Sequence, residues 1–305
     1  MKRVSFLSSL LLCTSVLFVS CNKEDVPEKI DDVCTKVTDV VFKRHLLENF
    51  DFNKDGKVSM DEAALCTTLE FKDEKVSNLT GIEYLTNLRE LYCNYSKMSS
   101  LDLSKNTALT TLNCNGCGLT SLSISKCTEL TVLECYSNNL TSLDVSNNTK
   151  LKQISCHGNN ISSLDFTKNK ALTNLLCGMG ATSSLDLAGL SNLSYLDCVE
   201  ANLTSIDLTG CTGLKDLLIY RNKLTALDIS SCPKLSRLCC QENQIVTLDL
   251  TYGDFPNCPS YLVPLKANNM PSLKTVYLKT GWQLKYINVN RSTSYIPATT
   301  EIVYK

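Results

Sequence analysis

Apolar residues recur along this chain in one pattern that repeats every 21 residues. Within each unit they stand at the first, fourth and sixth positions, as in Leu130-x-x-Leu133-x-Cys135. The fourth and sixth positions alternate with mostly polar ones, which is typical of a short strand with one buried face. The fixed interval indicates that the chain repeats one strand and one return segment, and that each unit packs mainly against its neighbours.

The pattern keeps strict register over eight units. A cysteine fills the sixth position of most units, and Ile219 takes its place in one. An imperfect unit precedes them, in which Cys66-x-x-Leu69-x-Phe71 aligns with the first regular unit at an offset of 22. The regular units begin at Leu88, Leu109, Leu130, Leu151, Leu172, Leu193, Leu214 and Leu235.

The units share the longer consensus Leu-x-x-Leu-x-Cys-x-x-Asn-x-Leu-x-x-Leu-Asp-Leu-Ser, seen for instance from Leu130 to Ser146. Its first part resembles the leucine-rich repeat consensus, whose strands form the concave sheet of a curved solenoid. The return segment of a 21-residue unit is too short for a full helix, so we expect extended or 3₁₀-like turns on the convex side. We therefore predict an α/β-type leucine-rich repeat solenoid of short parallel strands over residues 66–250.

Two polar columns accompany the apolar one. The first is an asparagine that should satisfy backbone groups where the chain leaves the sheet. The second is an aspartate, and we expect local bonds to backbone amides to stabilise these stacked carboxylates; a ladder bridged by cations is the alternative. The asparagines are Asn138, Asn159, Asn222 and Asn243, and the aspartates are Asp102, Asp144, Asp165, Asp186, Asp207, Asp228 and Asp249.

The cysteine column predicts packing rather than bonding. Setting aside Cys13 and Cys21 of the N-terminal segment leaves 15 of the 17 cysteines, an odd number that cannot be fully paired. Equivalent side chains on neighbouring parallel strands run side by side instead of converging. We expect buried free thiols that act as small apolar side chains. Disulfides or a stack of metal thiolates are the alternatives.

Residues 1–21 resemble an export signal. An apolar run over residues 4–19, too short to be a comfortable membrane span, follows two basic residues. The run leads to a site that resembles a bacterial lipobox and predicts lipidation of Cys21. Residues 22–25 resemble the export tag of Bacteroidota-type surface lipoproteins, and residues 22–35 are expected to form a tether. A conventionally cleaved secretory peptide is the alternative.

Residues 51–62 match the twelve-residue EF-hand calcium loop at every diagnostic position. Alternate residues of the loop offer side-chain oxygens, and Gly56 allows the sharp turn. Lys57 would bind through its carbonyl, Ser59 through a water molecule, and Glu62 with both carboxylate oxygens. The predicted calcium ligands are Asp51, Asn53, Asp55, Lys57, Ser59 and Glu62.

Helices are expected on both sides of this loop, an entering helix up to Phe50 and the start of an exit helix over Met60 to Thr68. The sequence contains no second loop of this kind, so we expect calcium to stabilise the structure; a sensor of calcium is the alternative. Residues 36–65 would form a small helical, EF-hand-like cap over the apolar end of the solenoid.

Candidate ligand contacts lie on the strand positions that alternate with the buried leucines and cysteines, because their side chains point to the concave face. Tyrosine and arginine with exposed apolar side chains contribute much of the contact energy in recognition sites. A solenoid face with scattered tyrosines and no ligand is the alternative. The candidates are Tyr92, Tyr95, Tyr136, His157, Leu176, Tyr195, Leu218, Tyr220, Arg221 and Arg237, and Met179 and Asp197 lie on the same face.

After Leu250 the register breaks in a turn-rich insertion. The segment Leu273-x-x-Val276-x-Leu278 is expected to recover one repeat strand, and residues 286–289 and 300–304 to form closing strands. Residues 251–305 are therefore expected to be a degenerate repeat and C-terminal cap.

The signal, export tag, calcium loop and repeats together resemble the leucine-rich repeat surface lipoproteins of gut Bacteroidota. The resemblance covers nearly the whole chain. It implies a lipid-anchored protein at the surface of the outer membrane, and the loop adds calcium as its cofactor.

The function predicted from the sequence is binding or adhesion through the concave face, with a protein or a glycan as ligand and a monomer as the expected state. A structural or assembly scaffold without a ligand of its own is the alternative. The net charge of -1 provides no field for nucleic acid. We expect no enzyme, because His45 and His157 are the only histidines and a Cys239–His157 pair would have to reach across about four rungs.

Overall fold

A computed structural model describes residues 31–72, 75–257, 265–282 and 299–305. These residues belong to one compact unit, Asp31–Lys305. The predictions for the export signal, the lipidated Cys21 and the closing strand at 286–289 lie outside the described residues.

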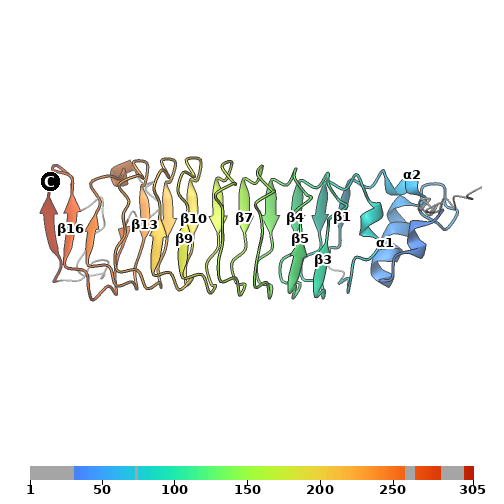
Figure 1. Cartoon of the computed structure of the whole chain (residues 1–305), viewed down its shortest axis with the longest axis horizontal. Helices are drawn as coiled ribbons and strands as arrows, with labels where there is room; N and C mark the ends of the chain where they lie inside the picture. The colour runs from blue at the N-terminus through green and yellow to red at the C-terminus, as the bar shows by residue number, and fades with distance from the viewer. Residues whose placement is uncertain (1–30, 73–74, 258–264, 283–298) are drawn as a thin grey trace, which may run out of the picture. The chain divides into compact units, whose positions relative to one another are not determined.

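Ten short parallel strands stack into one sheet along this unit (Figure 1). Each strand is two or three residues long, and each comes from a successive repeat. In chain order the strands are β1 (Thr68–Glu70), β2 (Glu90–Tyr92), β4 (Thr111–Asn113), β6 (Val132–Glu134), β7 (Gln153–Ser155), β8 (Asn174–Leu176), β10 (Tyr195–Asp197), β12 (Asp216–Leu218), β13 (Arg237–Cys239) and β15 (Leu265–Lys266). The predicted leucine-rich repeat solenoid is confirmed.

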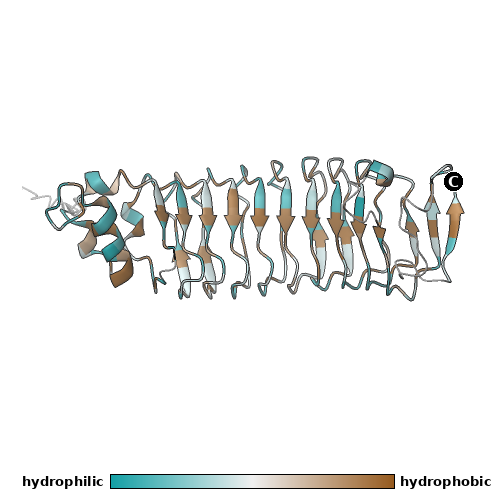
Figure 2. Ribbon diagram, turned by 180° about the vertical axis from the view of Figure 1, so that it is seen from behind, coloured by the Kyte–Doolittle hydropathy of each residue, from teal (hydrophilic) through white to brown (hydrophobic). Residues whose placement is uncertain are grey.

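The strands pair in the predicted register. Leu112 of β4 lies opposite Leu133 of β6, so the regular interval is 21 residues. Thr68 of β1 pairs with Glu90 of β2, which confirms the offset of 22 for the imperfect first unit. The central leucine or, in β7, Ile154 of each three-residue strand is buried, and Figure 2 shows hydrophobic segments in one strand after another along the stack.

The return segments of the repeats are extended, as predicted. Several form short parallel pairs of their own, on the side opposite the ten-stranded sheet. These pairs are β3 (Ser100–Asp102) with β5 (Ser121–Ser123) and β9 (Ser184–Asp186) with β11 (Ser205–Asp207). We call this side of the solenoid the turn side.

The aspartate column lies on the turn side and is held by local hydrogen bonds. Each carboxylate accepts from the backbone N–H two residues later, as Thr209 N does to Asp207 Oδ1 at 2.8 Å. Hydrogen bonds from the side chain and backbone of Thr209 lower the pKa of Asp207. The expectation of local amide bonds is confirmed for these carboxylates.

The asparagine column is buried beneath the ends of the four strands β6, β7, β12 and β13. Asn138 Nδ2 donates to the carbonyls of Cys114 and Cys135, and its Oδ1 accepts from the backbone of Cys117 and Leu119. One amide thus joins two neighbouring rungs, as predicted. A second buried column on the turn side, which the sequence analysis missed, contains Asn106, Asn148 and Asn169.

The cysteine column is buried in the core beside the leucines. The described cysteines are all free thiols, which agrees with the packing interpretation. Burial raises the pKa of Cys156 to about 12, so this thiol stays protonated and apolar. Ile219, which has neither a thiol nor a donor, is fully buried at the same position of its rung.

The strand expected after the insertion is present as β16 (Thr275–Leu278). It pairs with β14 (Thr247–Asp249) on the turn side, and not with the ten-stranded sheet. The sequence did not specify this side, because both parts of the repeat alternate apolar residues in the same way. The closing strand β17 (Glu301–Tyr304) pairs with β16.

The N-terminal end is helical, as predicted, but shorter on the exit side. Helix α1 (Val40–Phe50) enters the loop, whereas α2 (Met60–Ala63) ends before the strand β1 begins. The expected helix over Met60 to Thr68 is therefore wrong in length. The exit helix ends early because Thr68 already pairs with β2, and a residue in a sheet cannot continue a helix.

The predicted tether also requires correction. Val33 and Cys34 lie in the 3₁₀ helix η1 (Val33–Thr35), and both side chains are buried. Val33 N donates to Val58 O at 2.8 Å, and Val58 N donates to Asp32 Oδ1 at 3.1 Å. The segment before α1 thus pairs with the loop residue that usually joins two EF-hands, and it belongs to the folded unit.

Candidate functional site

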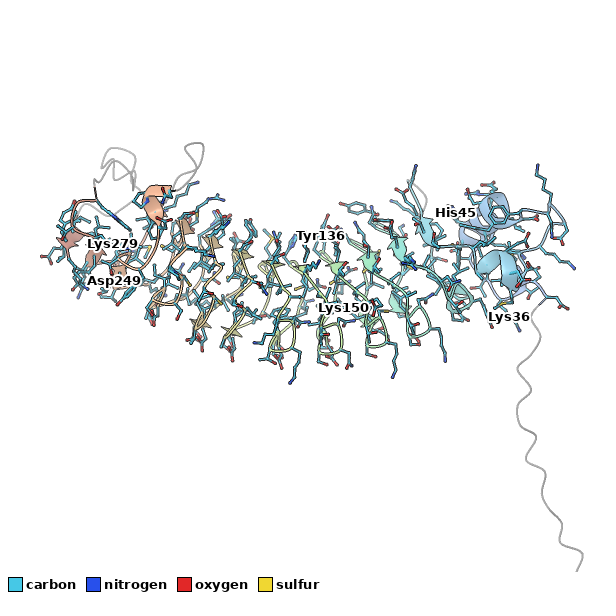
Figure 3. All side chains as sticks on the ribbon, turned by 90° about the horizontal axis from the view of Figure 1, so that it is seen from above. Lys36, His45, Tyr136, Lys150, Asp249 and Lys279 are labelled. Carbon is cyan, nitrogen blue, oxygen red and sulfur yellow. The ribbon has the colours of Figure 1, made fainter. Side chains whose placement is uncertain are left out.

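The face of the ten-stranded sheet carries the side chains that alternate with the buried column. Figure 3 shows Tyr136 on this face and Lys150 on the opposite side of the unit. We call the sheet face the concave face, because it lies on the inner side of the curve of the unit in Figure 3. All ten predicted ligand residues lie at or directly after its strands.

Three of the predicted residues form an aromatic row across neighbouring rungs. The Tyr136 ring stacks on His157, with ring centroids 4.6 Å apart and planes 11° from parallel. Tyr95, which lies two rungs away, is the main cause of the raised pKa of Tyr136. Gly116 leaves room for the Tyr95 ring, since a Cβ at Gly116 would lie 2.8 Å from it. The sequence predicted these three residues singly, and the structure places them in one row.

Polar side chains border this aromatic row. Asn113 Nδ2 and Asn115 Nδ2 both donate to Glu134 Oε2, at 2.8 and 3.3 Å. Asn115 Oδ1 in turn accepts from Tyr136 N at 3.1 Å. These amides hold Glu134 in one orientation beside the rings.

A pocket of 140 Å³ lies next to the aromatic row. Its walls include the predicted residues His157, Leu176 and Tyr220, but not the other seven. Gly178 lies in the same pocket, at the position that Tyr136, His157 and Tyr220 occupy in other rungs. A Cβ at Gly178 would lie 2.2 Å from Val199 O, so no side chain fits there. The remaining lining residues are Met179, Asp197 and Val199.

The remaining predicted residues lie outside the pocket. Arg221 is held between Glu200 and Glu242 on its two neighbouring rungs, at 2.6 and 3.1 Å. Arg237 lies 3.8 Å from Asp216. Arginines that are already paired across rungs stabilise the local geometry and are less available to a ligand.

The tyrosines at the edges of the face have neighbours of their own. Tyr92 OH lies 3.4 Å from Glu90 Oε2. Burial and then the nearby Asp197 raise the pKa of Tyr195, while Arg237 acts in the opposite direction. Leu218 is half-buried on β12, directly across from Asp197 of β10.

A column of left-handed residues runs along the edge of the concave face, and the sequence analysis missed it. The residue two positions after the cysteine has a positive φ in every rung, although most of these residues are not glycine. The signal was present in the two glycines of the column, Gly116 and Gly158, but the other side chains obscured it. The non-glycine members are Tyr95, Ser137, Met179, Glu200, Arg221, Glu242 and Asn269.

The predicted calcium loop is folded as a tight coil. Asp51 accepts from the backbone of Asp55 and Gly56, at 3.1 and 2.9 Å. Asp55 Oδ1 accepts from Lys57 N at 2.9 Å, and Asn53 Oδ1 accepts from Asp55 N at 2.8 Å. The side-chain oxygens of alternate residues therefore organise the loop backbone.

Glu62 closes this loop from the first turn of α2. Its Oε2 accepts from the backbone and the side chain of Ser59, and its Oε1 from Phe52 N at 3.0 Å. The hydrogen bond from the Ser59 backbone is the main cause of the lowered pKa of Glu62. The carboxylate is thus ionised at neutral pH and joins both ends of the loop.

The donor types of the loop fit calcium, since all of them are oxygens and each carboxylate keeps lone pairs beyond those used by N–H groups. The acidic groups are less close together than a metal cluster requires. In the described part of the chain, no three His, Cys, Asp or Glu side chains lie near enough to one another to hold a metal ion. Calcium binding by this loop stays a prediction.

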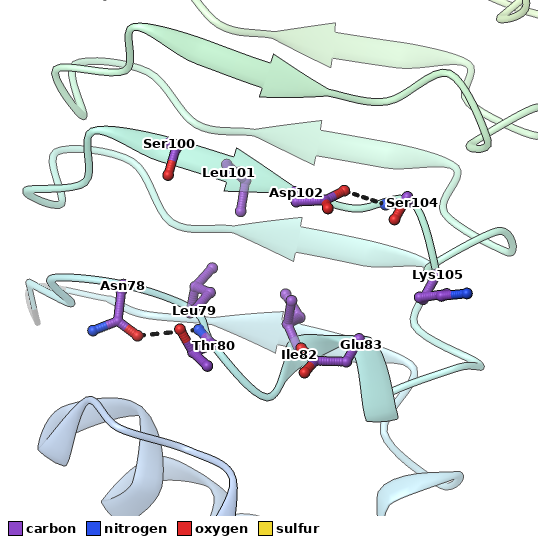
Figure 4. Close-up of a pocket in the computed structure, with 10 residues that line it drawn as sticks. All are labelled: Asn78, Leu79, Thr80, Ile82, Glu83, Ser100, Leu101, Asp102, Ser104 and Lys105. Atoms are coloured by element: carbon purple, nitrogen blue, oxygen red, sulfur yellow. Dashed lines mark hydrogen bonds between the residues drawn. The ribbon is translucent and has the colours of Figure 1, made fainter. Parts of the chain in front are cut away.

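A second pocket, of 410 Å³, lies at the N-terminal end of the turn side (Figure 4). The pocket lies between Leu79 and Thr80 of the first unit and the strand β3 of the next unit. The interval between these two units is the irregular one of 22 residues. Its carboxylates already have partners, because Glu83 accepts from Gly81 N and Asp102 from Ser104 N. No aromatic ring lines it, so it offers less contact energy than the concave pocket.

The one thiol and imidazole pair considered for catalysis is far apart. His157 follows β7 and Cys239 ends β13, with β8, β10 and β12 between these strands. At the usual strand spacing the two residues are separated by roughly 19 Å. Burial raises the pKa of the Cys239 thiol, which disfavours the thiolate. These two residues cannot act together as nucleophile and base.

The fold and this face define a leucine-rich repeat solenoid. No family model matches the chain. A stretch of 66 residues is 33% identical to Internalin J of Listeria monocytogenes; it covers 22% of this chain and only 7% of Internalin J. In the part of the chain that the structure describes, no helix is long and apolar enough to cross a membrane.

Solved structures show the same fold. An internalin (inlF) from Listeria monocytogenes is similar with a TM-score of 0.56 and 20% identity, over 91% of this chain and 98% of that one. Internalin C2 from the same species has a TM-score of 0.52 and 19% identity, over 82% and 98%. The leucine-rich repeat ectodomain of the Arabidopsis thaliana receptor kinase GASSHO1/SCHENGEN3, in complex with CASPARIAN STRIP INTEGRITY FACTOR 2, has a TM-score of 0.53 and 19% identity, over 80% and 30%.

Proposed function

We propose that this protein is a surface-displayed binding protein that recognises another protein through its concave face. The observation that carries the proposal is the continuous patch formed by the row Tyr95, Tyr136 and His157 and by the adjoining apolar pocket. Aromatic side chains that surround a partly buried pocket are the usual anchors of protein recognition. The fold supports recognition of a partner, since the similar plant receptor ectodomain was solved in complex with CASPARIAN STRIP INTEGRITY FACTOR 2.

The anchoring and the calcium loop complete the proposal. Lipidation of Cys21 would tether the folded unit to the outer membrane, with the unit displayed at the cell surface as a monomer. Calcium in the loop of residues 51–62 would stabilise the N-terminal cap. The lipobox-like site and the oxygen-rich loop in the sequence support these two elements.

Binding of the purified protein, from Asn22 onward, to a panel of extracellular-matrix and mucosal proteins and glycans tests the proposal. The variant Tyr136→Ala with Tyr220→Ala removes two rings from the concave patch. Tyr252→Ala is the matched control, because Tyr252 is exposed on the turn side, directly after β14. We expect a protein of the panel to bind with a Kd that rises by about tenfold or more in the double variant and stays unchanged in the control.

The alternative is a scaffold that spaces or assembles envelope proteins and has no ligand on this face. The regular stacking of the rungs is compatible with that role. Binding that is lost in Tyr252→Ala but kept in the double variant would favour the scaffold. Binding of a glycan alone would keep the face as the site and change the class of ligand.

A further inference from the structure

We propose that the concave pocket receives a Lys or Arg side chain of a protein partner, with Asp197 as its counter-ion. The inference rests on the proposed function and names the chemistry of the partner. The volume of 140 Å³ corresponds to about five water molecules, well below the roughly 300 Å³ of the smallest usual small-molecule sites. A pocket of this size suits one side chain of a docked protein.

Asp197 is a half-buried carboxylate without a cation. Its Oδ1 accepts from Val199 N at 3.2 Å, and Oδ2 accepts no hydrogen bond from the described residues. The arginines of the same face are engaged elsewhere, since Arg221 pairs with Glu200 and Glu242, and Arg237 with Asp216. A carboxylate in an apolar pocket is costly to desolvate unless a cation reaches it. A partner that covers the pocket must therefore supply that charge.

His157 does not supply a positive charge to Asp197. Burial lowers the pKa of His157, although Asp197 acts in the opposite direction. The imidazole is therefore neutral at pH 7, and its Nδ1 lies 3.0 Å from Ser155 Oγ. Tyr136 stacks on the His157 ring, so a neutral ring and not a cation forms this wall of the pocket.

The walls match the two ends of a long cationic side chain. Leu176, Met179 and Val199 provide apolar surface for the aliphatic stem, and Asp197 provides the charge for the head group. A purely apolar side chain would fill the same space but would leave Asp197 covered and unpaired. The pocket therefore favours Lys or Arg over Leu or Met.

The N-terminal rungs of the concave face carry acidic side chains. Glu70, Glu90 and Glu134 occupy strand positions of the first rungs, on the same face as the pocket. Acidic side chains arranged around an anchor pocket steer and orient a basic partner. The expected partner segment thus contains one inserted Lys or Arg and further basic residues that lie toward the N-terminal rungs.

The rim of the pocket carries an exposed apolar side chain. Met179 is 56% exposed, whereas it shares its positive φ of 52° with the equivalent residues of the other rungs. An exposed apolar side chain beside an anchor pocket offers contact area to a docked partner.

Methyl-labelled NMR with capped amino acids tests the inference. The probes are the N-acetyl methylamides of arginine, lysine and norleucine, observed through the methyl signals of Leu176, Met179 and Val199. We expect arginine and lysine to shift these signals and to bind more tightly than norleucine. In Asp197→Asn the affinity for both cations should fall by about tenfold. Asp186→Asn, which removes a charge on the turn side, is the matched control and should change nothing.

Three results would overturn the inference: norleucine binding as tightly as arginine, arginine binding unchanged in Asp197→Asn, or no shift of these methyl signals by arginine. The test is separable from that of the proposed function. A protein partner lost in Tyr136→Ala with Tyr220→Ala but kept in Asp197→Asn would leave the concave face as the binding site and reject the cationic anchor.

Discussion

At the scale of single residues, the left-handed backbone after each strand carries a steric cost in this solenoid. The chain needs a left-handed residue two positions after the cysteine, because there it turns sharply off the sheet while its N–H still bonds to the next rung, as Ser137 N does to His157 O at 2.9 Å. Only glycine enters that conformation at no steric cost. Most rungs nevertheless carry a side chain at this position.

Ser137→Gly should therefore stabilise the protein. Ser137 is exposed and has a φ of 54°, so removing its Cβ relieves strain without opening the core. We expect a gain of about 0.5 to 1 kcal/mol in the free energy of unfolding, measured by urea denaturation. Ser137→Ala, which removes the hydroxyl but keeps the Cβ, is the control and should bring no gain. A stability below that of the natural protein for Ser137→Gly would contradict this account.

At the scale of elements, buried amides join the rungs. A strand of three residues has few backbone bonds of its own, so each rung depends on side chains that reach its neighbour. Asn159 Nδ2 donates to the carbonyls of Cys135 and Cys156, at 3.0 and 2.9 Å, and its Oδ1 accepts from Leu140 N. The cysteine side chains fill the space between these hydrogen bonds. They form fewer hydrogen bonds between rungs than the asparagines do.

Asn159→Ala should destabilise the unit, because it leaves Leu140 N and the Cys156 carbonyl without the Asn159 amide, while the Cys135 carbonyl keeps its bond from Asn138 Nδ2. At about 1 to 3 kcal/mol for each of these two buried groups, the loss is expected to reach about 2 kcal/mol or more. Asn160→Ala changes the adjacent, exposed asparagine and should cost less than about 0.5 kcal/mol. Thermal unfolding followed by circular dichroism compares the two variants. Equal melting temperatures would show that this column does not join the rungs.

At the scale of the whole molecule, the N-terminal cap is linked to the repeats by specific contacts. Asp39 caps α1 through the backbone of Phe42, and its Oδ2 accepts from the backbone and side chain of Ser77, at 2.7 and 2.6 Å. Phe42 also packs edge-on against Phe71 of the first unit, with ring centroids 5.8 Å apart. These contacts couple the cap to the first rung, so a change that stabilises the cap also stabilises that rung.

Calcium should raise the stability of this whole unit. An extracellular loop with a Kd of ~10⁻⁴ M for calcium would add about 2.7 kcal/mol to the free energy of unfolding when the free calcium concentration is about a hundred times that Kd. We expect chelator to lower the melting temperature, and Glu62→Gln to remove the difference between calcium and chelator. Asp61→Asn, a change in the adjacent exposed acid, should keep it. Identical melting curves of the natural protein with calcium and with chelator would reject the calcium site.

The sequence by itself determined the solenoid, its register and its buried columns. Leucine, cysteine and asparagine at a fixed interval leave one arrangement that buries the apolar side chains and pairs the backbone of every rung, and the structure confirms it from β1 to β13. Where the period ends, the sequence predicted less. It indicated the strand over Leu273 to Leu278 but not its place on the turn side, because alternation alone does not distinguish the sheet from the turn side.

Only the tertiary structure decided what the concave face offers. Tyr95 and Tyr136 are about two repeats apart in the chain and Tyr136 and His157 are one repeat apart, and the stacking of rungs places all three in one row. The pocket depends on a missing side chain at Gly178, on neighbours from three rungs, and on arginines that pair with other acids and leave Asp197 alone. A periodic sequence specifies where each rung lies, but the properties of its surface arise from contacts between rungs that the period does not encode.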